Sequence, residues 1–323
     1  MMHMNGNEIL GKKNTTAMRG IAIIMVILHH YSQYYSTPGY FHQILDQFGY
    51  LAVGLFFVLS GYGNKISFQK RQFNKKNSLL WLLKRIFHIY VTFWVILIIA
   101  YPLMQYICGI EWKPEIVLQN CITLTLPTWT NWYLKIQVML YIIFVLTECL
   151  FHKVKYSSAI ITVLLLCYIV CVRHMGFMNF WWNTVLCYPL GIFIAEIKDD
   201  FSTKNFMKIP FIGSILVFIV ATYLKQWNNL WGIIASLCFC VIVLYFNTMY
   251  TIGGKILAWT GKRSLEIYMT HLIVIRILLS LKVQALPAFV LIFVLAFVYA
   301  IVVHKIVDMI LSKGINIWES RKK

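Results

Sequence analysis

Long apolar stretches alternate with short polar segments along almost the whole chain. A hydrocarbon core about 30 Å thick is crossed by about 20 apolar residues in a helix. The pattern therefore predicts ten membrane-spanning helices, at residues 17–36, 47–66, 86–107, 131–151, 157–173, 180–197, 209–224, 230–248, 264–281 and 286–311. The stretch 108–130 contains Pro114 and Pro127, so we expect a loop there with a short interfacial or re-entrant piece. The predicted fold is an all-α polytopic membrane protein with one membrane-embedded domain over residues 1–323.

The composition supports a membrane protein and excludes three other classes. Of the 323 residues, 60% are hydrophobic and 12% are charged, whereas a soluble domain carries about 25% charged residues. A soluble globular protein, a disordered chain and a disulfide-stapled secreted module are therefore excluded. The eight cysteines form no CxxC pair and mostly lie in apolar runs. We interpret them as small buried hydrophobes and expect no metal site. No small-residue cleavage site follows the first apolar run, so we expect no cleavable signal peptide.

The charge distribution predicts the topology. The formal net charge is +18, and excess Lys and Arg collects in cytoplasmic loops. If the N-terminus is cytoplasmic, 23 of the 29 Lys and Arg residues fall on the inner side, four fall outside and two lie within spans. This asymmetry predicts that both termini are cytoplasmic. It also explains the basic charge without nucleic acid as a partner.

The first span carries a basic residue and a histidine in phase. Arg19 and His30 are eleven residues apart, which is three helical turns plus about 20°, so they share one helix face about 16 Å apart along the axis. His29 lies about 80° from that line on the other side. This face would place a cation at the cytoplasmic mouth and a titratable base deep in the bilayer. Alternatively, Arg19 snorkels to the surface and His30 bonds to a neighbouring helix.

Other polar residues narrow the chemistry. No Asp or Glu falls near the middle of a predicted span, which disfavours ion-coupled transport. Ser60 lies about 9 Å from the inner edge and His30 about 20 Å, so a Ser–His nucleophilic pair is not expected. Gly54 and Gly61 are interpreted as a close-packing helix face.

Further polar and aromatic residues open three later spans. Individually they are typical of interfacial anchors. Four of the basic residues fall together near the cytoplasmic surface: Arg19, Lys84, Arg85 and His271. At the outer start of the fourth span lie Trp132, Tyr133 and Gln137.

Four sequence blocks resemble the acyltransferase-3 family of integral membrane O-acyltransferases, and the resemblance covers nearly the whole chain. The blocks, in order, are Arg19-Gly20 with His30, the FFxxSG motif of Phe56, Phe57, Ser60 and Gly61, Arg85 with Tyr90, and Ser264, Ile267, Tyr268 and His271. Three positions depart from the family pattern. Leu82 replaces a common basic residue, His88 replaces a proline, and Gln137 replaces a glutamate.

The resemblance implies transfer of an acyl group, usually acetyl, from cytoplasmic acyl-CoA to a hydroxyl of an envelope glycan or lipid-linked sugar. It implies that His30 is the essential base and that Arg19, Lys84, Arg85 and His271 engage the acyl-CoA. The donor acetyl-CoA would be a substrate, and no permanently bound cofactor is expected.

We further expect Trp132, Tyr133 and Gln137 to contact the sugar and the protein to act as a stand-alone unit without an SGNH domain. The bilayer of a bacterial plasma membrane would surround it, and its oligomeric state stays open. An acyl-histidine intermediate at His30 also stays open. The alternative functions are a transporter or flippase for glycan intermediates, or a non-catalytic scaffold subunit.

Overall fold

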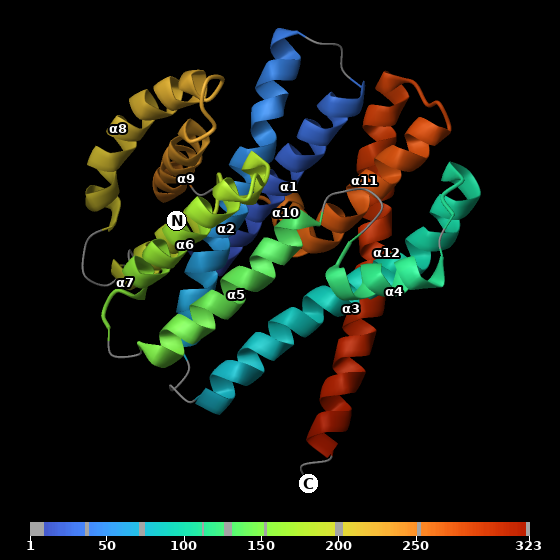
Figure 1. Cartoon of the computed structure of the whole chain (residues 1–323), viewed down its shortest axis with the longest axis horizontal. Coiled ribbons are helices and arrows are strands. Elements are labelled where there is room, and N and C mark those ends of the chain that lie inside the picture. Colours follow the sequence, from blue (N-terminus) through green and yellow to red (C-terminus); the bar gives the residue numbers. More distant parts are fainter. Residues whose placement is uncertain are drawn as a thin grey trace. The chain divides into compact units, whose positions relative to one another are not determined.

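The computed structural model describes residues 10–35, 39–70, 75–111, 113–125, 131–151, 154–197, 203–250 and 253–320. These residues form helices and no strands (Figure 1). The helices are α1 (Lys12–Tyr35), α2 (Tyr40–Gln69), α3 (Lys75–Cys108), α4 (Pro114–Thr123), α5 (Trp132–Leu150), α6 (Ser157–His174), α7 (Cys187–Ile197), α8 (Thr203–Leu224), α9 (Trp231–Met249), α10 (Lys255–Lys262), α11 (Ser264–Ser280) and α12 (Ala285–Ser320), with a 3₁₀ turn at Asn179–Trp181. The predicted all-α class is confirmed for this part of the chain.

Five helices in the described ranges are long and apolar enough to cross a bilayer: α2, α3, α5, α6 and α12. The chain is therefore a multi-pass membrane protein, and the total of ten spans stays a prediction. Several basic residues behind the charge asymmetry, among them Arg71, Lys153 and Lys198, lie outside the described residues.

The predicted helix at 180–197 is too long, because only Cys187–Ile197 is helical. Its 11 residues rise about 16 Å, roughly half of a hydrocarbon core. α4 supplies the short piece expected within 108–130, and α10 was not expected.

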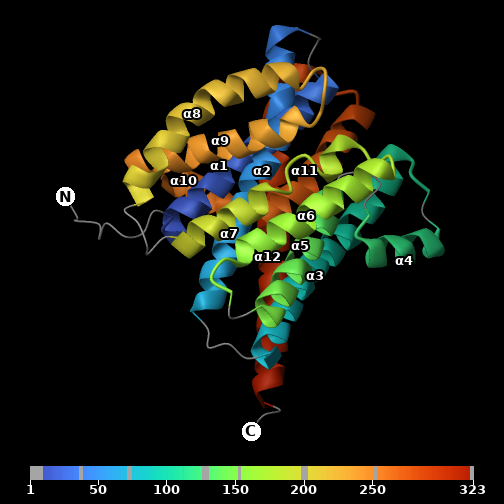
Figure 2. The same cartoon turned by 60° about the vertical axis from the view of Figure 1, so that its left-hand side comes forward.

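The chain forms two compact units. The first unit comprises Met1–Val26, Gln47–Leu79 and Met139–Lys262. The second unit comprises Ile27–Asp46, Leu80–Val138 and Arg263–Lys323. Within the first unit, α8 and α9 lie side by side in both views (Figures 1 and 2). Within the second unit, α11 and α12 form the corresponding adjacent pair.

Glycine brings α2 and α7 of the first unit into backbone contact. A Cβ at Gly61 would overlap the carbonyl oxygen of Tyr188, and a Cβ at Gly191 would overlap that of Val58. Gly54, two turns earlier on α2, packs against side chains of α7 and α9. Small residues allow this close approach of helices in lipid. The predicted packing role of Gly54 and Gly61 is confirmed.

A second reciprocal crossing explains how the short α10 is held. A Cβ at Gly20 of α1 would overlap the carbonyl oxygen of Leu257, and a Cβ at Gly261 of α10 would overlap that of Thr16. Eight residues are too few for a helix to be stable alone. Packing against α1 therefore stabilises α10.

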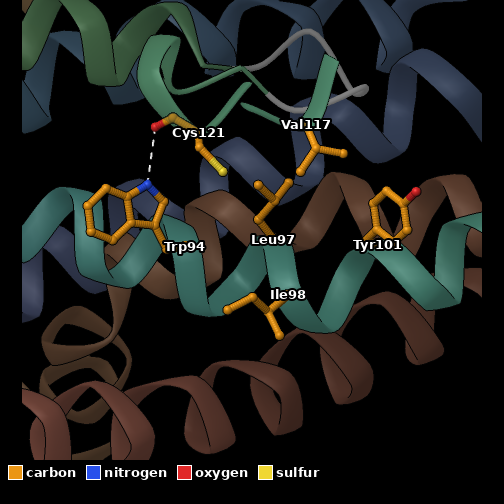
Figure 3. Close-up of a pocket in the computed structure, with 6 residues that line it drawn as sticks. All are labelled: Trp94, Leu97, Ile98, Tyr101, Val117 and Cys121. Carbon is orange, nitrogen blue, oxygen red and sulfur yellow. Dashed lines mark hydrogen bonds between the residues drawn. The ribbon is translucent and has the colours of Figure 1, made fainter. Parts of the chain in front are cut away.

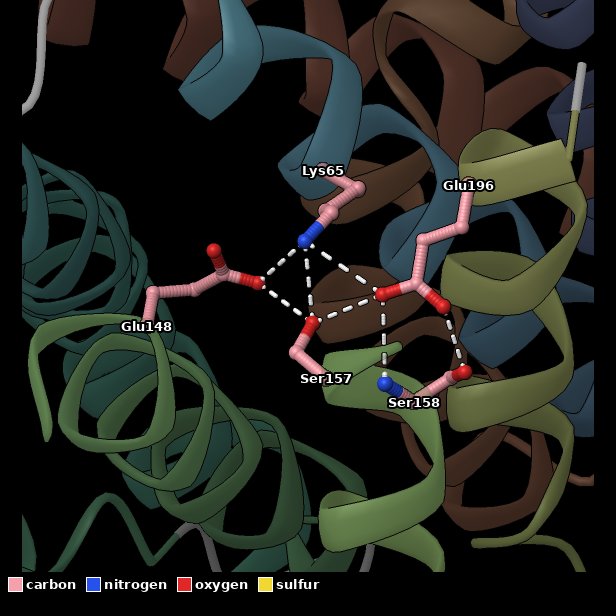
Figure 4. A network of polar contacts seen from close by, with 5 residues as sticks. All are labelled: Lys65, Glu148, Ser157, Ser158 and Glu196. Atoms are coloured by element: carbon pink, nitrogen blue, oxygen red, sulfur yellow. Dashed lines mark hydrogen bonds and ion pairs between the residues drawn. The ribbon is translucent and has the colours of Figure 1, made fainter. Parts of the chain in front are cut away.

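A buried ionic network joins α2, α5, α6 and α7 of the first unit (Figure 4). Lys65 Nζ lies 2.7 Å from Glu148 Oε1, 3.3 Å from Glu196 Oε1 and 2.9 Å from Ser157 Oγ. Ser157 Oγ also contacts both carboxylates, at 2.6 and 2.8 Å. Ser158 adds bonds from its backbone N–H and its hydroxyl to Glu196. The sequence analysis did not identify this network.

In the second unit, an acidic and a basic side chain join α11 to α12. The buried Glu266 Oε1 lies 2.6 Å from His304 Nδ1, and His304 Nε2 lies 3.4 Å from Asp308 Oδ2. This contact connects α11 to α12.

Candidate functional site

His30 lies near the C-terminal end of α1, in the second unit. Its side chain is partly exposed, and its Nδ1 lies 2.9 Å from Gln33 Oε1, three residues later on the same helix. With that amide oxygen as acceptor, Nδ1 carries the hydrogen and Nε2 keeps its lone pair. Gln33 was not identified from the sequence, although its i+3 spacing from His30 is the signal that could have found it.

His271 of α11 lies directly against His30. Their ring centroids are 5.2 Å apart with an angle of 34° between the ring planes. His271 is fully buried, and its Nδ1 lies 3.1 Å from the carbonyl oxygen of Ile267. Because a carbonyl only accepts, Nδ1 of His271 must carry the hydrogen. Its Nε2 is buried and has no hydrogen-bond partner among the described residues.

Two tyrosines and a glutamine extend this arrangement. Tyr268 lies one turn before His271, with ring centroids 5.8 Å apart, and the Tyr133 ring of α5 is 4.9 Å from Tyr268. The Tyr133 hydroxyl donates to Gln137 Oε1 at 3.4 Å. We call His30, His271, Tyr268, Tyr133 and Gln137 the histidine–tyrosine cluster. All except His30 are buried.

The cluster combines residues that the sequence analysis placed at opposite membrane surfaces. Tyr133 and Gln137 were expected on the outer half, and Tyr268 and His271 near the cytoplasmic mouth. Contact between Tyr133 and Tyr268 shows that this difference in depth is wrong. Asn131, which directly precedes α5, is also buried, at 3% exposure.

His29 also lies beside the site. Its ring is 4.8 Å from that of His30, and its Nδ1 lies 3.6 Å from Asp46 Oδ1 on α2. It therefore has a carboxylate neighbour, whereas His30 faces His271. α1 is continuous through Arg19 and His30, as the phase argument for these two residues requires.

The basic residues expected at the cytoplasmic mouth belong to two different units. Arg19 belongs to the first unit, is partly exposed and lies beside Gly63 of α2. In the second unit, Lys84 is exposed, and the Arg85 guanidinium lies 4.3 Å from the centre of the Trp81 ring. Stacking on an aromatic ring restricts the orientation of the guanidinium plane.

The structure also locates the remaining residues of the predicted motifs. In the first unit, Phe56 and Phe57 are buried and Ser60 is partly exposed beside the glycine crossing of α2. In the second unit, Ser264 is the first residue of α11, and the Trp132 ring is 6.4 Å from that of Tyr133.

An apolar hollow of about 490 Å³ lies between α3 and α4 in the second unit (Figure 3). Trp94 Nε1 donates to the carbonyl of Cys121 at 3.1 Å, which ties α4 to α3 over the hollow. Its lining residues are Trp94, Leu97, Ile98, Tyr101, Val117 and Cys121. Burial raises the pKa of the Cys121 thiol, so the thiol stays protonated at neutral pH and is a poor nucleophile. The hollow suits hydrocarbon and offers no base.

The fold and site define a multi-pass helical membrane protein with two adjacent imidazoles, each with an unprotonated Nε2. Such nitrogens accept a proton or an acyl group from a bound substrate. The sequence model for the acyltransferase domain of the acyltransferase-3 family matches residues 14–305, so the chain belongs to this family and is a membrane acyltransferase. The predicted family membership is confirmed. No curated protein and no solved structure matches the chain.

Proposed function

We propose that the protein transfers an acyl group from cytoplasmic acyl-CoA to a hydroxyl of an envelope polysaccharide or lipid-linked sugar, and that this acyl group is acetyl. The observation that carries this proposal is the orientation of His30 within the acyltransferase domain. Its Nδ1–H is committed to Gln33, which leaves Nε2 to act on the substrate. General-base catalysis requires such a nitrogen within hydrogen-bond reach of the hydroxyl.

The donor would be recognised by its phosphates. CoA is polyanionic, and charge-assisted contacts from Arg19, Lys84 and Arg85 would hold it. The fixed guanidinium of Arg85 suits a bidentate contact. On the acceptor side, Trp132 and Tyr133 offer aromatic surfaces to a sugar ring. Gln137 offers an amide where many relatives carry a carboxylate.

The topology belongs to the same proposal. Both units would act as one membrane-embedded domain with ten spans and both termini in the cytoplasm of a bacterial cell. Single cysteines near residues 70 and 320 should then be labelled from the inside, and those near 42 and 115 from the outside. Labelling of the two termini from opposite sides would contradict ten spans.

The activity is tested with purified protein in lipid nanodiscs. Acetyl-CoA and a glycan acceptor are added, and free CoA and acylated glycan are measured together. An acyltransferase releases one CoA for each ester formed. A flippase or a scaffold subunit releases none, and that result would reject the proposed function.

A further inference from the structure

The second histidine of the cluster has no assigned step in a single direct transfer. One base is enough to remove a proton from an attacking hydroxyl. The structure nevertheless places two imidazoles 5.2 Å apart, and both present Nε2 without a hydrogen. A buried nitrogen acceptor that lacks a partner costs about 1–3 kcal/mol. A chemical role would account for keeping His271 in this state.

The two histidines differ in access. His30 is partly exposed, whereas His271 is 0% exposed. The thioester carbon of acyl-CoA, which is a bulky substrate, can therefore reach His30 Nε2 more readily than His271 Nε2. His271 is also held by the backbone of its own helix through Ile267, so its ring cannot turn to follow a substrate. The access of His30 suits a nucleophile, and the fixed ring of His271 suits a base. The acceptor hydroxyl must then reach His271 Nε2 from the side of His30, whose ring centroid lies 5.2 Å away.

Gln33 is suited to stabilise an acylated His30. If His30 is acylated at Nε2, the ring becomes a cation that still carries Nδ1–H. Gln33 Oε1 accepts from that N–H at 2.9 Å and stabilises the positive charge. The Nδ1–H of His271 has a comparable neutral acceptor in the carbonyl of Ile267, so the division of roles rests on the difference in access between the two rings.

We propose that transfer takes place in two steps, in which His30 is acylated first and His271 is the catalytic base that activates the acceptor hydroxyl in the second step. This inference rests on the proposed acyl-CoA-dependent function. It reassigns His271 from donor binding, as first expected, to the chemistry.

Both steps balance. In the first, His30 Nε2 attacks the thioester carbon, the N–C bond forms, and the C–S bond breaks with its electron pair leaving on the CoA thiolate. In the second, the hydroxyl oxygen attacks the acyl carbon while His271 Nε2 takes its proton. The C–N bond then breaks, its electrons return to His30 Nε2, and the ester is released. The proton on His271 passes to the thiolate, so the products are ester and CoA.

The test separates the two steps. Without any acceptor, labelled CoA should be exchanged into acetyl-CoA, because the first step is reversible. His271→Asn and His271→Gln should keep this exchange within about threefold but lose transfer to the glycan by about 10²–10⁴-fold. His30→Gln should lose both. The control is His174→Gln, at the exposed end of α6, which should behave like the unaltered protein.

The asparagine variant is chosen on structural grounds. Its amide nitrogen occupies the place of Nδ1 and can still donate to Ile267, but no base remains where Nε2 was. Retained exchange in this variant also shows that it is folded. Melting temperatures are measured for all variants.

Each other outcome overturns the proposal. If the unaltered protein acylates the glycan but exchanges no CoA, there is no acyl-enzyme, although the proposed function stands. If both His271 variants lose exchange and transfer equally, His271 is not specific to the second step. If neither variant folds, His271 is a structural residue. Absence of CoA release with every acceptor would instead reject the proposed function itself.

Discussion

Replacing Lys65 by methionine should be strongly destabilising. In the buried network of Figure 4, Lys65 is the cation between Glu148 and Glu196, at 2.7 and 3.3 Å. Methionine preserves much of the side-chain volume but leaves two carboxylates facing each other across Ser157. Removing one partner of a buried ion pair costs about 3–5 kcal/mol. We therefore expect the free energy of unfolding to fall by about that amount.

The matched control is Glu148→Gln. This change removes one of the two carboxylates but leaves Lys65 paired with Glu196, and the new amide oxygen can still accept from Lys65. We expect a cost of about 1 kcal/mol or less. The double variant should be more stable than Lys65→Met alone, because the second change removes one uncompensated charge. The expected coupling is about 1–2 kcal/mol.

The assay is unfolding of the three variants in mixed micelles by sodium dodecyl sulfate, followed by tryptophan fluorescence. Activity against acetyl-CoA is measured at a temperature where every variant is folded. If Lys65→Met unfolds within 1 kcal/mol of the unaltered protein, or if the two changes are additive, the network does not act as a charge-balanced unit.

Three further results are expected. His30→Ala should reduce acyl transfer by about 10²–10⁴-fold without loss of protein, while His29→Ala should be milder because its ring has a carboxylate neighbour; equal losses would contradict this assignment. Arg85→Ala should raise the KM for acetyl-CoA more than it lowers kcat, because phosphate contacts act mainly in binding. If donor binding is unchanged, Arg85 contributes only to the charge asymmetry that sets the membrane topology. Gly61→Ala should lower the melting temperature, because the added methyl group forces α2 away from α7. Gly213→Ala should not, because there is open space around Gly213. The same shift in both variants would show that the close contact of α2 with α7 at Gly61 does not contribute to stability.

Much of the helical fold could be predicted because apolar length is a direct signal in a membrane protein. The predicted helix at 131–151 is observed at Trp132–Leu150, and that at 157–173 at Ser157–His174. The signal fails where apolar residues form something other than a helix. Residues 182–186 are turns with Trp182 buried. An aromatic turn and a helix have the same hydropathy, so the predicted helix at 180–197 begins too early compared with α7, which starts at Cys187.

The site was predictable only within one helix. Helical phase relates Arg19 to His30, and the same reasoning applies to Gln33. The contact between His30 and His271 is tertiary, and its prediction required the depth of each residue. That depth was counted from an assumed surface at Ser264. In the structure, α10 ends at Lys262 and α11 begins at Ser264, so a helix that was not predicted directly precedes this residue. Counting from Ser264 therefore placed His271 among the mouth residues.

Hydrogen bonding distinguishes the network around Lys65 from His271 by physical role. The side chains around Lys65 partner one another at 2.5–3.3 Å, so most of the cost of burying their charges is offset. His271 is buried to a similar extent, but only one of its two nitrogens is bonded within the described residues. The first arrangement offsets most of its own burial cost, whereas the second leaves part of that cost uncompensated. Substituting Lys65 should therefore change stability first, and substituting His271 should change chemistry first.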